Sequence, residues 1–153
     1  HAVVFRIGEI ICAAPAGIVR EILPRLPATR IPGVPDAVEG LVNVRGSVVP
    51  LTDLRVAFGM PAAEATPDTR FIVLDLPLGD APMAVAISAD KVETVTPLDP
   101  DQILPVPEVG TLWPPDYVRG ICKLGEDFVL LPDLNRIFQD FSASGDHRKD
   151  LPK

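Results

Sequence analysis

The sequence has few of the residues on which catalytic and metal sites depend. Histidine occurs only at His1 and His147, and the two cysteines, Cys12 and Cys122, do not form a C-x-x-C pair. A Ser-His-Asp or Cys-His catalytic group and a zinc site therefore lack candidate residues. No glycine-rich phosphate-binding loop follows an apolar segment either. We expect a protein that is not an enzyme and holds no metal or cofactor.

Positive charge and long apolar runs are also scarce. The chain has 14 Lys and Arg against 21 Asp and Glu, a net charge of −7, so it lacks the basic face that nucleic acids and anionic lipids require. Its apolar run at residues 71–74 stops at Asp75, far short of the roughly 18 residues of a membrane span. We expect no nucleic-acid partner, no direct membrane insertion and two buried, reduced cysteines in a cytoplasmic protein.

Proline is abundant, with 18 residues spread along the chain. Together with glycine, it interrupts almost every window long enough for a helix. The apolar segments between these interruptions are short and rich in Val and Ile, which is typical of strands. The predicted strands are residues 3–7, 10–13, 41–44, 48–51, 71–76, 83–87, 92–95, 120–124 and 128–131.

Short helical turns are predicted at two places. Asp53 can cap a turn that ends at Phe58, and Asp133 can cap one that ends at Phe138. The same pair of aspartates could instead be read as an aspartic-protease dyad. Neither is followed by Thr-Gly or Ser-Gly, so helix capping is the favoured interpretation. These features together predict an all-β fold with short helical turns.

The two halves of the chain repeat one another. Residues 38–41 are similar to residues 118–121, and residues 49–54 to residues 129–134, both at a spacing of 80. A weaker match, spaced by 73, joins residues 19–22 to residues 92–95. The repeat predicts two units of about five strands, each curled into a small barrel without exposed edges. Residues 60–69 are expected to form the exposed connection between the units.

The repeat also separates folding residues from candidate binding residues. Gly40 and Asp53 recur as Gly120 and Asp133, as folding residues should. Three polar residues of the first half do not recur: Glu21, Asn43 and Arg45 correspond to Thr94, Lys123 and Gly125. These three are the better candidates for contacts with a partner.

Alternative roles stay open for two of these candidates. Arg45 is either a solvated turn residue, an anchor that offers planar hydrogen bonding to a partner, or the partner of Glu21 or Glu39 within the protein. Asn43 is either a buried amide that shapes the Arg45 turn or a contact with a partner.

Residues 38–55 resemble the signature of the CheW family, G-x-x-N-L-R-G-x-x-x-P-x-x-D-L-R, with Val44 in place of the leucine. Residues 5–8 and 19–22 resemble the first hairpin and the V-x-E-[IV] strand of that family. Residues 131–134 resemble the end of its second barrel, so the resemblance covers about residues 3–140.

The resemblance implies a fold of two SH3-like five-stranded β-barrel subdomains packed together. We expect one CheW-like domain over residues 1–141, with barrel halves of roughly 15–65 and 2–14 plus 66–141, followed by a flexible C-terminal tail over residues 142–153.

The resemblance also implies a function. It predicts a non-enzymatic adaptor of bacterial chemotaxis that couples the cytoplasmic tip of chemoreceptors, the methyl-accepting chemotaxis proteins, to the regulatory domain of the histidine kinase CheA. Such an adaptor is cytoplasmic and associates with receptor arrays at the inner membrane. The positions that match family residues for receptor binding or coupling are Val19, Glu21, Gly40, Asn43 and Arg45.

Two alternative functions remain open. The chain could be the CheW-like domain of a larger signalling protein, a kinase or a CheV-type protein. It could also be a sensor domain that holds a small ligand in a cleft between the barrels.

Overall fold

The computed structural model describes residues 1–30, 32, 38–106 and 114–140. The expected C-terminal tail lies outside these residues. The strands are β1 (Ala2–Ile7), β2 (Ile10–Pro15), β3 (Val19–Pro24), β4 (Ala28–Thr29), β5 (Val38–Val44), β6 (Ser47–Thr52), β7 (Arg70–Leu76), β8 (Met83–Ala89), β9 (Lys91–Thr96), β10 (Ile103–Leu104), β11 (Val118–Leu124) and β12 (Asp127–Pro132). The helical elements are η1 (Ala16–Ile18), α1 (Leu54–Ala57), η2 (Pro100–Gln102), η3 (Pro115–Tyr117) and a helix over residues 134–140.

The all-β prediction is confirmed, and each of the nine predicted apolar segments lies within a strand. Both short helices also form where the capping aspartates predicted them. The Oδ1 atom of Asp53 accepts a hydrogen bond from the backbone N–H of Arg55 at 2.9 Å, and that of Asp133 accepts one from Arg136 at 3.1 Å. Both aspartates are therefore occupied as helix caps. None of the helices in the described ranges has the length and apolar character of a membrane span.

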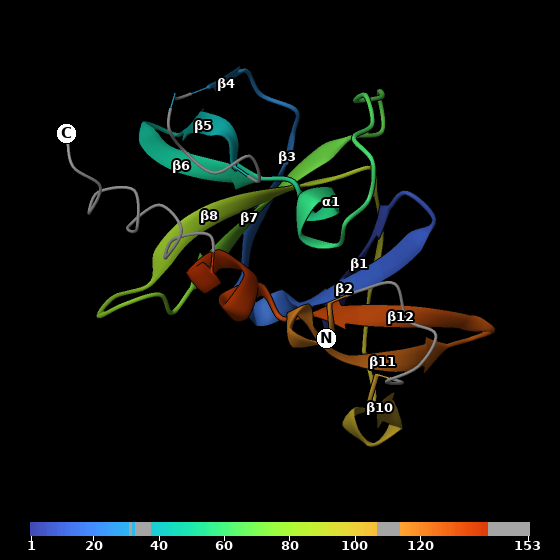
Figure 1. Cartoon of the computed structure of the whole chain (residues 1–153). Coiled ribbons are helices and arrows are strands. Elements are labelled where there is room, and N and C mark those ends of the chain that lie inside the picture. The colour runs from blue at the N-terminus through green and yellow to red at the C-terminus, as the bar shows by residue number, and fades with distance from the viewer. Residues whose placement is uncertain (31, 33–37, 107–113, 141–153) are drawn as a thin grey trace.

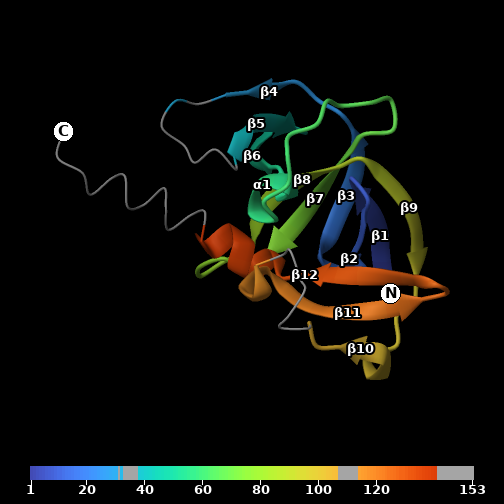
Figure 2. The same cartoon turned by 45° about the vertical axis from the view of Figure 1, so that its right-hand side comes forward.

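The strands form two six-stranded sheets, which we call sheet A and sheet B (Figures 1 and 2). The order in sheet A is β9-β1-β2-β12-β11-β10, and the order in sheet B is β3-β7-β8-β6-β5-β4. The two orders match element by element under the sequence repeat. In each sheet five strands have six or seven residues, and the sixth, β4 or β10, has only two.

The sheets exchange hairpins between the halves of the chain. The β1–β2 hairpin of the first half joins β9–β12, whereas the β7–β8 hairpin of the second half joins β3–β6. The two junctions are the parallel pairs β2–β12 and β6–β8. The expected boundary near residue 65 therefore differs from the observed strand pairing, since residues 70–89 belong with β3–β6. The loop over residues 60–69 connects α1 to a strand of sheet B, not one barrel to the other.

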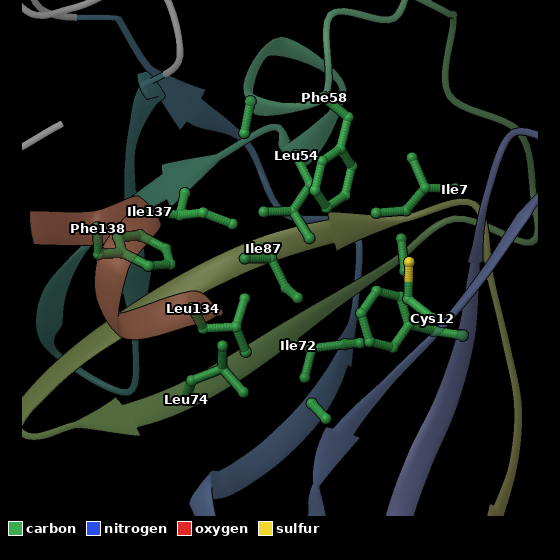
Figure 3. Close-up of a cluster of buried hydrophobic side chains, with 14 of the residues drawn as sticks. Ile7, Cys12, Leu54, Phe58, Ile72, Leu74, Ile87, Leu134, Ile137 and Phe138 are labelled. Atoms are coloured by element: carbon green, nitrogen blue, oxygen red, sulfur yellow. The ribbon is translucent and has the colours of Figure 1, made fainter. Parts of the chain in front are cut away.

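The largest hydrophobic core lies between the two sheets. It combines side chains of β1 and β2 with side chains of β7 and β8, and both short helices close it (Figure 3). Strand β7 takes part on both of its faces: Ile72 and Leu74 face this shared core, while Phe71 and Val73 fill the interior of sheet B. A smaller cluster fills sheet A. The hairpin exchange and the shared core make the two barrels one folding unit.

Both cysteines are buried and unpaired. Cys12 lies in the shared core, where burial raises the pKa of its thiol to about 12. A thiol with so high a pKa stays protonated at neutral pH and is a poor nucleophile.

Candidate functional site

The turn between β5 and β6 carries two of the candidate residues. Arg45 is the single non-glycine residue with positive φ in the described part of the chain, at 51°, and Gly46 follows at 86°. The repeat places Gly125, with φ of 63°, at the position of Arg45. The left-handed conformation is unfavourable for residues with a side chain. The fold therefore holds an arginine where the other barrel has a glycine.

Asn43 stabilises this turn. Its side-chain Oδ1 atom accepts a hydrogen bond from the backbone N–H of Gly46 at 2.9 Å. Of the two alternatives for Asn43, a buried amide or a contact with a partner, the burial is contradicted, because Asn43 is exposed. Its role in shaping the Arg45 turn is nevertheless visible, since a local side-chain bond of this kind competes well with regular strand pairing.

Glu21 on β3 forms an ion pair with Arg45. The Nε atom of Arg45 lies 3.1 and 3.2 Å from the two carboxylate oxygens of Glu21. The Glu21 side chain is 19% exposed, but that of Arg45 is 77% exposed. Of the two internal partners considered for Arg45, Glu21 is therefore the one observed, and the side chain of Glu39 lies outside the described residues. The pair orients the guanidinium without burying it.

Gly40 has a packing role. A Cβ atom at this position would lie 2.6 Å from the carbonyl oxygen of Thr29, so only glycine allows β4 to approach β5 this closely. Gly120 allows the same close approach of β10 to β11, since an added Cβ would lie 2.9 Å from the carbonyl oxygen of Leu104. The recurrence of this glycine thus follows from the same close approach in both barrels.

Val19 lies at the start of β3 and packs, partly buried, against the shared core. A β-bulge separates it from Glu21. The structure therefore brings Glu21, Asn43 and Arg45 together at one end of sheet B. Val19 and Gly40 also belong to sheet B, but the role that the structure shows for each is packing.

The arrangement suits recognition rather than bond chemistry. An exposed guanidinium offers planar, multi-donor hydrogen bonding to a carboxylate or to backbone carbonyls of another protein. In the part of the chain that the structure describes, His, Cys, Asp and Glu form no group of three or more that could hold a metal ion.

Several exposed apolar residues were not predicted from the sequence. Val48 is 69% exposed and Phe128 64% exposed, and the repeat places them at equivalent positions of the two barrels. Ile22 and Val95 are a second equivalent pair, 38% and 55% exposed. The signal that could have found them is strand register, since alternation in β6 and β12 turns these positions outward.

Comparisons with known proteins agree with this fold. The family model described as a CheW-like domain matches residues 1–142. The chemotaxis protein CheW of Klebsiella aerogenes is 35% identical over 109 residues, which cover 71% of this chain and 63% of that protein. The chemotaxis protein CheW of Rhizobium meliloti is 28% identical over 136 residues, which cover 89% of this chain and 85% of that protein.

A solved structure shares the fold. The crystal structure of the scaffolding protein TtCheW from Thermoanaerobacter tengcongensis superposes with a TM-score of 0.80 at 30% sequence identity. The match covers 90% of this chain and 86% of that one.

Proposed function

The chain belongs to the family of CheW-like domains, and from this premise we propose that it is a non-enzymatic adaptor that couples chemoreceptors to the histidine kinase CheA. Relatives named as chemotaxis proteins and a structural neighbour named as a scaffolding protein support this role. Neither the small-ligand sensor nor a domain of a kinase or CheV-type protein is favoured by these relatives. An adaptor of this kind acts in the cytoplasm, beside receptor arrays at the inner membrane.

The observation that carries the receptor-binding part of the proposal is the presentation of Arg45. The turn holds Arg45 in the left-handed conformation, Asn43 fixes that turn, and Glu21 orients the guanidinium, which remains 77% exposed. The other barrel has none of these three polar residues at its equivalent positions. We therefore assign receptor binding to this end of sheet B, with Arg45 as its anchor.

The test is receptor binding by the Arg45→Ala variant. We expect a loss of about tenfold or more in affinity for a receptor-tip fragment, as is usual for a truncated anchor residue. Stability should change by less than about 1 kcal/mol, because the Arg45 guanidinium is 77% exposed and its attraction to Glu21 is screened by solvent. Both quantities can be measured on the same preparation by co-sedimentation and thermal unfolding.

Arg6→Ala is the matched control. Arg6 also forms an exposed ion pair, with Glu93 at 2.6 Å, but it lies in sheet A. The control should bind the receptor fragment like the wild type. Normal binding by Arg45→Ala, or its unfolding, would remove Arg45 as the anchor.

A further inference from the structure

A polar cluster joins the two barrels where the chain crosses from sheet B to sheet A. Figure 2 shows β8 and β9, which belong to sheet B and sheet A. Asp90 is the single residue between them in the chain. Its Oδ2 atom accepts a hydrogen bond from the backbone N–H of Gly8 at 2.7 Å and pairs with the Nη2 atom of Arg55. Gly8 lies in the β1–β2 turn of sheet A, and Arg55 lies in α1, directly after β6 of sheet B. One carboxylate oxygen therefore contacts both barrels.

The cluster is shielded from solvent on the Arg55 side. The side chain of Arg55 is 9% exposed and that of Asp90 is 34% exposed. The backbone N–H of Asp90 also donates to the carbonyl oxygen of Arg6 at 2.8 Å, which fixes Asp90 to β1. A charge pair with one buried partner holds its geometry tightly, because separating it would leave a buried charge without compensation.

The repeat shows that this cluster exists at only one of the two equivalent crossings. The equivalent of Arg55 is Asn135, and the equivalent of Asp90 is Gly17, which lies between β2 and β3. Neither replacement carries a charge, and Gly17 has no side chain. The barrels of a simple duplication would be joined alike at both crossings. The Arg55–Asp90 pair is thus a feature that the fold itself does not require.

We propose that Arg55 and Asp90 form an inter-barrel pin, a contact that fixes the orientation of sheet A relative to sheet B. A partner bound to one barrel is then held in a fixed orientation relative to a partner bound to the other. Both are positioning residues and touch no partner in this role. The consequence for coupling rests on the proposed adaptor function, whereas the effect on barrel orientation does not.

The orientation can be tested without any partner. Spin labels are attached to two exposed turn positions, Asp80→Cys in sheet B and Glu126→Cys in sheet A, and the distance between them is measured by pulsed electron paramagnetic resonance. The native cysteines are buried, which disfavours their labelling. We expect one narrow distribution in the wild type and a distinctly broader one in Asp90→Asn. The Arg6→Ala control should keep the narrow distribution.

Arg55→Lys provides the second variant, because it keeps the charge and alters only the planar geometry of the donor. It should also broaden the distance distribution, and the backbone N–H of Gly8 should exchange its hydrogen faster in both variants. A folded Asp90→Asn or Arg55→Lys protein with a wild-type distribution would overturn the pin.

The functional consequence is tested on the same variants. Binding to the receptor-tip fragment alone should stay within twofold of the wild type, while receptor-dependent stimulation of CheA should fall at least fivefold. Full stimulation by a variant with a broadened distribution would overturn the role of the pin in coupling. Failure of the wild-type chain to couple the two partners would instead contradict the adaptor function and leave the distance result standing.

Discussion

At the scale of single residues, the backbone of Arg45 explains how this chain presents a charged group. The equivalent position of the other barrel is Gly125, which adopts the same left-handed conformation without steric cost. An arginine at such a position destabilises the turn by roughly 1–2 kcal/mol. Its presence there is consistent with a role in binding rather than in folding.

Comparison of two substitutions isolates this strain. Arg45→Ala and Arg45→Gly remove the same ion pair with Glu21, but only glycine relieves the left-handed conformation. We expect Arg45→Gly to be more stable than Arg45→Ala by about 1 kcal/mol in urea unfolding, with equally poor receptor binding. Equal stability of the two variants would show that the turn relaxes in solution and carries no strain.

Asp90 gives a prediction about acid stability. Burial by itself raises the pKa of this carboxyl, but hydrogen bonds from Arg55 and Gly8, together with the charge of Arg55, hold the pKa below its ordinary value of 3.8. The charged form is therefore favoured by folding. Its contribution to stability is present above about pH 4 and is lost as the pH falls through the lowered pKa.

The difference in unfolding free energy between the wild type and Asp90→Asn tests this directly. It should be constant from pH 5 to pH 8 and shrink as the pH falls below about 4. Denaturant titrations at each pH provide the measurement. A difference that grows on acidification would mean that the folded state favours the protonated carboxyl.

At the scale of single elements, the strands and caps could be predicted because their signals are local. Apolar segments marked nine of the strands, the resemblance to the V-x-E-[IV] pattern added β3, and the aspartates at positions 53 and 133 marked both helices. The two-residue strands β4 and β10 could not be found this way. Both are exposed, and each forms only because a glycine on the neighbouring strand allows it to come close.

The close approach at Gly40 yields a prediction for β4. In Gly40→Ala the added Cβ would meet the carbonyl oxygen of Thr29 at 2.6 Å, so β4 must move away from β5. We expect a loss of about 1–3 kcal/mol in unfolding free energy, with faster hydrogen exchange at residues 28–29. Gly17→Ala is the matched control, because nothing lies within 4 Å of its Cβ position. Equal effects of the two substitutions would contradict the packing role of Gly40.

At the scale of the whole molecule, the sequence repeat predicted two units but not how they interlock. The expected halves, residues 15–65 and residues 2–14 plus 66–141, placed the first hairpin with the later strands but left β7 and β8 out of the first barrel. The hairpin exchange instead depends on the parallel pairs β2–β12 and β6–β8, whose residues lie far apart in the chain. Long-range pairings of this kind leave no local signal in the composition of either strand.

The candidate site could be predicted in part, because the repeat compares each residue with its equivalent in the other half. The absence of Glu21, Asn43 and Arg45 from the second half of the repeat identified them as candidates, and the structure places all three at one end of sheet B. The Arg55–Asp90 contact was out of reach of the sequence, since it joins positions 35 residues apart through the crossing between the sheets. A charged residue in a family motif does not reveal which barrel it contacts.

The central claim is that this chain bridges a receptor and CheA, and recruitment of the kinase tests it most directly. Receptor-tip fragments are immobilised, and binding of the CheA regulatory domain is recorded while the concentration of the chain increases. We expect recruitment to rise and then fall, because excess adaptor occupies each partner separately. Arg45→Ala should shift the rise to higher concentration. Kinase binding that is the same with and without the wild-type chain would contradict the account.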